Sequence, residues 1–182
     1  MTDVWIFQAS PGMIQHWGWF LAFGIVLVAL GIAAIVKSTT ATVVSVYFFG
    51  WLLVVASIFE FVSAFMVGNW AGFFVHLLIA LLFGVVGVLM LVKPVLSAEE
   101  LTLVMSAFFL IAGLYQLIVA LWAHLPGWGW QALNGVIATV MGVLILLGWP
   151  STGLWVIGLF VGIELVFYGW AWMALAITMR KV

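Results

Sequence analysis

The hydrophobic residues of this chain lie in six long runs separated by short polar or proline-containing breaks. All four prolines lie outside the runs. Because the apolar stretches are continuous rather than alternating, and most reach the ~20 residues that a spanning helix requires, they predict transmembrane α-helices. The runs cover residues 14–36, 41–67, 72–92, 101–123, 131–147 and 153–177.

Two breaks carry helix-start signals. Ser97 and Glu100 have the spacing of a capping box, in which each side chain satisfies a free backbone N–H, so we expect the fourth helix to begin near Ala98. Ser151 or Thr152 is expected to cap the sixth helix.

The runs repeat with a period of 55 to 56 residues. The segment Gly31–Lys37 matches Gly87–Lys93 at an offset of 56, and Gly142–Gly148 follows at an offset of 55. Each of these blocks ends the first helix of a copy. In the second helices, small residues recur seven apart and so share one helix face. They are Gly50 and Ser57, Ser106 and Gly113, and Gly162 and Gly169.

Each copy therefore comprises two helices, and because two is an even number, all copies enter the membrane from the same side. Such parallel repeats are related by an axis along the membrane normal. We expect an all-α membrane protein of six transmembrane helices, built as three parallel two-helix repeats in a compact bundle with approximate three-fold pseudosymmetry. The expected parts are an N-terminal interfacial segment (1–13), one transmembrane domain (14–178, with repeats at about 14–67, 72–123 and 131–177) and a short basic tail (179–182).

Small residues predict where the helices pack, since lipid supplies no hydrophobic drive and close backbone approach replaces it. Gly158 and Gly162 form a GxxxG pair, while Ala80 with Gly84 and Ala138 with Gly142 are small-xxx-small pairs. We expect these contacts to be intramolecular, the alternative being homo-oligomerisation through the sixth helix. The expected packing residues are Gly31, Gly84, Gly87, Gly142, Gly158 and Gly162.

Composition excludes several classes of function. Hydrophobic residues make up 69% of the chain and charged residues 5%, against about a quarter in soluble domains, so the chain cannot form a soluble surface. Without Cys there is no disulfide and no thiolate nucleophile or metal ligand. Four Lys and Arg residues form no basic stripe, which excludes nucleic acid as a partner. No Lys or Arg precedes Lys37, so we interpret the first run as a retained helix and not a signal peptide.

Charge alone does not set the orientation. Six spans put both termini on one side, with Arg180 and Lys181, and leave Lys37 and Lys93 on the other side. The positive-inside count is therefore two against two.

Glu60 and Glu164 are the only acidic residues inside the predicted spans, and an intramembrane carboxyl is a functional hypothesis by default. Glu60 lies on a helix face of small and hydroxylated residues, so we expect it to face the bundle interior. Its repeat equivalents are Gln116 and Trp172. Glu164 lies near the middle of the sixth run, where Tyr168, four residues on, could donate a hydrogen bond.

Two main roles stay open for the polar residues of the spans. They can be interhelical hydrogen-bonding groups, worth about 1 kcal/mol or less each. Alternatively, the carboxyls sense or conduct protons, and ligand binding is a third role. We expect both carboxyls to face protein, near Tyr168, Gln116 or a backbone carbonyl, because an unpaired polar group in lipid is costly. The polar candidates are Glu60, Glu164, Gln116, Asn134 and Tyr168.

The sequence predicts no catalytic or metal-binding constellation. His16, His76 and His124 fall near helix ends without a second histidine at ligand spacing, so we interpret them as interfacial residues and not as haem or metal ligands. No Ser/His/Asp arrangement or glycine-rich phosphate loop can be argued. We expect neither enzyme activity nor a cofactor.

Three tandem two-helix repeats in 182 residues, with a glycine-rich first helix in each, resemble the bacterial HdeD family of acid-resistance membrane proteins. The resemblance covers about Trp17 to Met173. Its most specific segment is Val161–Phe167, similar to the family's Gly-Ile-Glu/Asp-Leu-hydrophobic-Phe pattern, which places Glu164 on a motif position. It implies an inner-membrane protein linked to acid stress, with both termini in the cytoplasm and no established biochemical activity. The chain departs from the family in lacking a basic N-terminal segment and in its 12 Trp residues.

We therefore expect a non-enzymatic protein of the bacterial inner membrane that helps the cell tolerate acid or envelope stress, through a pH-sensitive polar interior or by reinforcing the bilayer. The alternative is an accessory subunit of a larger membrane complex, which the short loops and abundant aromatic residues favour. A proton or small-solute channel is a third interpretation, for which the few polar residues supply little lining. The expected partners are the lipid bilayer and either a second copy or a larger complex.

Overall fold

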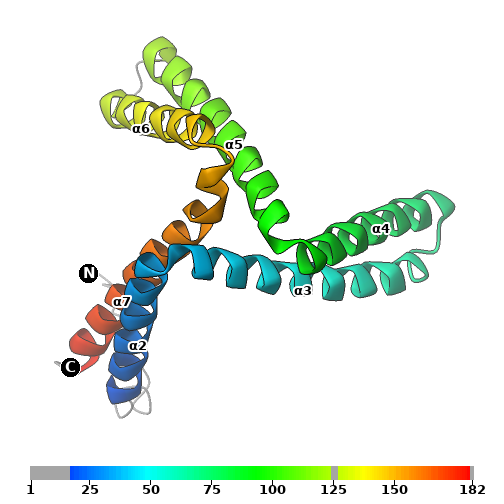
Figure 1. The fold of residues 1–182 in the computed structure, drawn as a ribbon, viewed down its shortest axis with the longest axis horizontal. Coiled ribbons are helices and arrows are strands. Elements are labelled where there is room, and N and C mark those ends of the chain that lie inside the picture. The colour runs from blue at the N-terminus through cyan, green and yellow to red at the C-terminus, as the bar shows by residue number, and fades with distance from the viewer. Residues whose placement is uncertain (1–16, 124–126, 181–182) are drawn as a thin grey trace, which may run out of the picture. The chain divides into compact units, whose positions relative to one another are not determined.

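Figure 1 shows a chain made of helices and short connections. The structure, a computed structural model, describes residues 17–123 and 127–180. Among these residues are six helices that are long and apolar enough to cross a membrane, and no strand. The predicted all-α, multi-pass membrane fold is thus confirmed. The expected interfacial segment over 1–13 and the end of the basic tail lie outside the described residues. The helices are α2 (Trp17–Val36), α3 (Ser38–Ala64), α4 (Trp70–Val92), α5 (Pro94–Ala123), α6 (Trp128–Leu147) and α7 (Val156–Arg180), with a short 3-10 helix, η1 (Ser151–Leu154), before α7.

The chain divides into two units, one with two closely packed helix pairs and the other with one. In the unit Ser38–Gly158, α3 packs along α4, and α5 packs along α6 (Figure 1). In the other unit, α2 packs along the part of α7 from Leu159 onward (Figure 1). Each pair joins the second helix of one copy to the first helix of the next, and the last copy pairs back with the first.

This pairing differs from the expected hairpin of two helices within one copy. Only Lys93 separates α4 from α5, whereas Phe65–Asn69 connect α3 to α4. Two antiparallel helices need a loop of about 2–5 residues to lie side by side. The two helices that pack together are therefore not the two helices of one sequence copy. Each packed pair begins one helix later than the copy does.

The three pairs make the same close contact at equivalent positions. The contacts are Gly31 with Gly162, Gly87 with Gly50, and Gly142 with Ser106. A Cβ added to the first residue of each contact would lie 2.7, 3.0 and 2.9 Å, respectively, from the carbonyl oxygen of the second. Glycine lets the two backbones touch at this layer, and such close approach is what holds helices together in lipid.

A second layer lies seven residues further along each helix. Gly24 meets Gly169 in the α2–α7 pair, and Gly135 meets Gly113 in the α5–α6 pair. In the α3–α4 pair the equivalent residues are Ala80 and Ser57. Each pair is therefore held at two layers of small residues about 10 Å apart along the helices.

Two helix starts differ from those predicted. Helix α5 begins at Pro94, so Ser97 lies in its first turn and its backbone N–H donates to the carbonyl of Lys93 at 3.0 Å. Proline suits the first helical position, because its missing N–H would have had no partner there. Helix α7 begins after η1, in which Ser151 and Thr152 donate back to carbonyls at the end of α6 and cap no helix start.

The buried core of the Ser38–Gly158 unit lies where the second helices of the three copies begin. Val46, Thr102 and Gly158 occupy equivalent positions 56 residues apart, and all three are buried. The backbone N–H of Gly158 donates to the hydroxyl of Thr42, also fully buried, at 2.8 Å.

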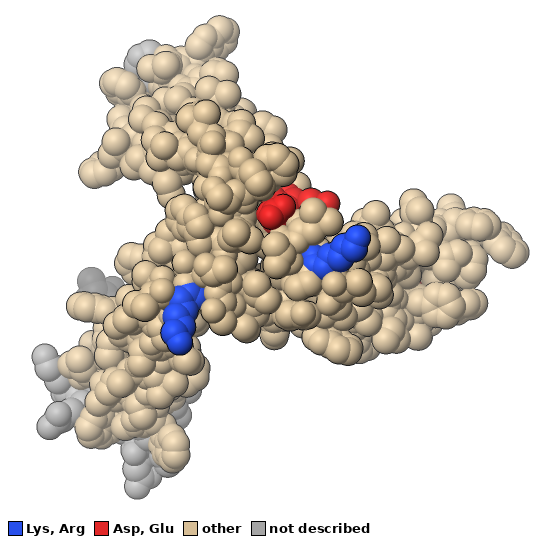
Figure 2. Space-filling model, viewed as in Figure 1, with Lys and Arg blue, Asp and Glu red and all other residues tan. Residues whose placement is uncertain are grey.

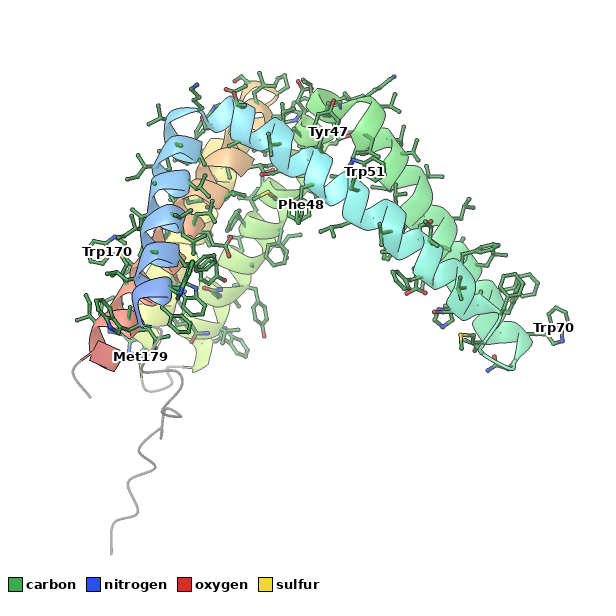
Figure 3. The ribbon with its side chains drawn as sticks, turned by 90° about the horizontal axis from the view of Figure 1, so that it is seen from below. Tyr47, Phe48, Trp51, Trp70, Trp170 and Met179 are labelled. Carbon is green, nitrogen blue, oxygen red and sulfur yellow. The ribbon has the colours of Figure 1, made fainter. Side chains whose placement is uncertain are left out.

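Most of the remaining surface is apolar, as expected of helices that face lipid. Figure 2 shows a face on which charged side chains occupy only small areas. Large aromatic side chains point outward from their helices (Figure 3), among them Phe48 and Trp51 on α3 and Trp170 on α7, which are 60%, 61% and 66% exposed.

Candidate functional site

Two ionisable side chains of the α3–α4 pair, one from each helix, meet across the helix interface. Nδ1 of His76, on α4, lies 2.6 Å from Oε2 of Glu60, on α3, which is a hydrogen bond. In the tautomer with a proton on Nδ1, the imidazole donates to the carboxylate. Both side chains are about one-third exposed, at 33% for His76 and 31% for Glu60. The pair is therefore a polar contact at the edge of the helix interface and not a sealed core group.

Local sequence explains why these two residues meet. Gly68 adopts a left-handed conformation with φ of 46°, and the backbone N–H of Gly72 donates to the side chain of Asn69, which caps the start of α4. The chain thus reverses around Gly68, and Glu60 and His76 each lie eight residues from it. Residues equally distant from the turn of an antiparallel helix pair come together.

The depth of the contact follows from its distance to the helix ends. Glu60 precedes the end of α3 by four residues, and His76 follows the start of α4 by six, which are about 6 and 9 Å. Both helices exceed the ~20 residues needed to cross the hydrocarbon core. The contact accordingly lies in the outer part of that core, nearer to its loop-side edge than to its middle.

The same position carries different chemistry in the other two pairs. In the α2–α7 pair the equivalents are Phe20 and Trp172, whose rings stack 5.6 Å apart with an interplanar angle of 6°. In the α5–α6 pair they are Gln116 and Gln131, both half-buried. One position of the repeat thus holds a carboxylate with an imidazole, two amides, or two stacked rings.

The other predicted polar residues do not join this contact. Glu164 and Tyr168 are exposed on α7, and no hydrogen bond links them in the described structure. Leu52 and Phe108, the repeat equivalents of Glu164, are also exposed, so the position faces outward in every copy. The expectation of a protein-facing Glu164 partnered by Tyr168 is not met within the described residues. Asn134, on α6, is exposed as well.

The partner of Glu60 was missed in the sequence. Tyr168, Gln116 or a backbone carbonyl was expected near a carboxyl, and His76 was interpreted as an interfacial residue, but the structure pairs Glu60 with His76. The equal spacing of both residues from the Gly68–Asn69 break was the available signal. This spacing indicates a contact only if the second run (41–67) packs on the third (72–92). The repeat instead suggested that the first run packs on the second.

No group of three or more His, Asp or Glu side chains that could hold a metal is found in residues 17–123 and 127–180. His16 and His124 lie outside the described residues. The contact can exchange protons and offer hydrogen bonds, because Nε2 of His76 and Oε1 of Glu60 are left over by the bond between the two residues.

A family model described as a short repeat of unknown function, DUF308, matches residues 22–92 and again residues 78–147. The two matches start 56 residues apart, which is the period of the repeat, and each contains one complete helix pair, α3–α4 or α5–α6. DUF308 is the repeat that HdeD-type proteins carry. No curated protein and no solved structure matches the chain. Because the matches together span well over half of the sequence, the chain belongs to the DUF308 family of short-repeat proteins.

Proposed function

We propose that this protein is a non-enzymatic membrane protein of the bacterial inner membrane, with both termini in the cytoplasm, that helps the cell tolerate acid. The observation that carries the proposal is the 2.6 Å contact between Glu60 and His76. It is an ionisable pair that bridges two spanning helices, and it is accessible enough to exchange protons with the interface.

Protons can add to both members of this contact, because an imidazole and a carboxylate are ionisable groups. With a carboxylate and an imidazolium the contact is an ion pair that bridges α3 and α4. With a neutral carboxyl it leaves an imidazolium at the edge of an apolar medium, where an unpaired charge is costly. The loop end of the α3–α4 pair is then expected to open, while the glycine contact of Gly50 with Gly87 still holds the other end.

The response is confined to one helix pair. At the equivalent position, neither the stacked Phe20 and Trp172 nor Gln116 and Gln131 can gain a proton in the physiological range. Two pairs therefore stay unchanged while one responds, an arrangement that suits a sensor built on a stable repeat scaffold.

Complementation of a deletion strain tests the proposal. The wild-type gene should restore survival of an acid challenge, and the double variant Glu60→Gln/His76→Gln should reach the membrane in equal amount but fail to restore it. This variant is a matched one, because it installs the two residues that the α5–α6 pair has at this position. Equal survival of the deletion strain and its parent, or full rescue by the double variant, would contradict the proposal.

A second candidate function, an accessory subunit of a larger membrane complex, is favoured by Glu164. This carboxyl is exposed on a spanning helix at a position where the other copies have Leu52 and Phe108. A carboxyl that faces lipid without a partner is costly, whereas a donor on a neighbouring protein would satisfy it. Stoichiometric co-purification in mild detergent that is lost in Glu164→Leu would support this role. A monodisperse small species with either residue would contradict it.

A further inference from the structure

An apolar groove runs along the α3–α4 pair next to the contact between Glu60 and His76. It has a volume of about 680 Å³, within the range of ligand-binding clefts. Its floor is made of the small residues Ser57, Ala80 and Gly84, and larger apolar residues form its walls. The walls include Ile58, Phe61, Leu77, Leu81, Val85 and Leu89.

The groove exists because this pair has glycine where the other two pairs have branched side chains. The repeat equivalents of Gly84 are Val28 and Thr139. Both lie against the facing glycine: a Cβ on Gly169 would lie 2.6 Å from Cγ2 of Val28, and a Cβ on Gly113 would lie 2.5 Å from Oγ1 of Thr139. The α3–α4 pair instead places Gly84 opposite Ser57, and so leaves the space above the floor open.

The groove runs along much of the apolar length of α4. From Leu77 to Leu89 it covers twelve residue steps, which is about 18 Å. Leu77 lies about 10 Å from the start of α4, and Leu89 about 4 Å from its end. A chain that enters from the loop end and lies in the groove therefore stays against protein past the middle of the bilayer.

The polar contact stands at the loop end of this groove. Glu60 follows Ser57 by three residues and His76 precedes Ala80 by four, so each lies one turn from the floor on the same helix face. Trp70, 79% exposed at the tip of the α3–α4 pair (Figure 3), has the character of a residue at the membrane–water interface. The groove thus has an apolar body and a polar end near the headgroups.

We propose that this groove binds one acyl chain of a phospholipid with a primary-amine headgroup. The ammonium group donates to Oε1 of Glu60, the carboxylate oxygen that the contact with His76 leaves over. A quaternary ammonium cannot donate, so phosphatidylethanolamine should be preferred to phosphatidylcholine. Binding at the groove does not depend on the acid response proposed above, since it uses the contact as it exists at neutral pH.

Native mass spectrometry of the full-length protein, released from nanodiscs of equal phosphatidylethanolamine and phosphatidylcholine, measures the bound lipid. We expect one retained phosphatidylethanolamine molecule. The variant Ser57→Gly/Gly84→Val fills the groove with the residues that the α2–α7 pair has at these positions, Val28 and Gly169, and so should fold. Retention should fall about tenfold, the change expected when about two methylene groups lose their burial. Thr139→Val in the α5–α6 pair is the matched control and should leave retention unchanged.

Each result has a defined meaning. Glu60→Gln should retain lipid but lose the preference for phosphatidylethanolamine, and an equal preference in the wild type would contradict the headgroup assignment. Full retention by Ser57→Gly/Gly84→Val would contradict the groove, as would a dimer that this variant abolishes, because a second copy would then be the occupant. The variant keeps Glu60 and His76, so a lost lipid with intact acid rescue separates this inference from the proposed function.

Discussion

At the scale of single residues, the contact between Glu60 and His76 differs from its two repeat equivalents in chemistry but not in place. A stacked aromatic pair and a pair of amides occupy the same position on the same scaffold. The helix pair therefore does not need ionisable side chains to form. What Glu60 and His76 add is a pair of ionisable side chains.

The double variant Glu60→Gln/His76→Gln should fold with nearly the stability of the wild type at neutral pH, because interhelical hydrogen bonds in membranes are worth about 1 kcal/mol or less. Its thermal unfolding in detergent should change less between pH 7 and strongly acidic pH than that of the wild type, because the two amides carry no ionisable proton. Unfolding curves for the two proteins measured across this pH range check the prediction. Parallel losses of stability in both proteins would show that other groups cause the pH dependence.

Thr102 offers a second residue-scale prediction. It is fully buried, and its hydroxyl has no hydrogen-bond partner in the described structure. Its repeat equivalent, Val46, is equally buried and has the same shape with a methyl in place of the hydroxyl. Thr102→Val should therefore raise the free energy of unfolding by about 1 kcal/mol, because a buried polar group without a partner is costly. A decrease in the free energy of unfolding would show that the hydroxyl bonds to a helix carbonyl or to water. Thr42→Val is the contrasting variant: it removes the acceptor for the backbone N–H of Gly158 and should be destabilising.

At the scale of helices, two layers of small residues decide which helices pair. The contact of Gly31 with Gly162 is as close as that of Gly87 with Gly50, although the first joins the two ends of the chain and the second joins neighbours. Pairing thus depends on the matched positions and not on nearness in sequence.

Substitution of these glycines should destabilise the pair in proportion to how close the backbones are. A Cβ at Gly31 would lie 2.7 Å from the carbonyl oxygen of Gly162, so Gly31→Ala forces the helices apart and should cost about 1–3 kcal/mol of unfolding free energy. Gly18→Ala, on the same helix, meets nothing within 4 Å and should be neutral or slightly stabilising. Thermal unfolding of both variants in one detergent makes the comparison. Equal stability of the two would show that this layer does not hold α2 to α7.

Sequence reasoning predicted the helices better than their pairing. Six apolar runs and the positions of the prolines were enough to place the spans, because length and hydropathy are local properties. The start of α5 at Pro94 was missed because the capping-box spacing at Ser97 was given more weight than proline's fitness for a first helical turn. The contact between Glu60 and His76 was missed for a different reason: it depends on which helices pair, and that follows from single-residue connections such as Lys93, which a hydrophobicity pattern does not resolve.

At the scale of the whole molecule, the repeat connects the copies in a cycle. The second helix of each copy packs on the first helix of the next, and α7 returns to α2. The first and the last helix of the described residues therefore form one packed pair, and six spans place the outer ends of these two helices on the same side of a membrane. The orientation of the protein in the membrane is then fixed by the side on which the ends of this helix pair lie.

We predict that both termini face the cytoplasm. With both termini in the cytoplasm, the loop between α3 and α4 is cytoplasmic and the turn between α4 and α5 faces outward. The chain has no Cys, so one introduced thiol reports one position. Met66→Cys, where the native residue is 81% exposed, samples the first site, and Lys93→Cys, also at an exposed residue, samples the second. A membrane-impermeant maleimide should label Lys93→Cys on intact spheroplasts and Met66→Cys only after the membrane is opened, because the bilayer keeps the charged reagent out. The unsubstituted protein, which has no thiol, is the control for background labelling.

The reverse labelling pattern would place both termini outside and put the contact between Glu60 and His76 next to the external medium. Labelling of both thiols on intact spheroplasts would contradict the six-span topology itself.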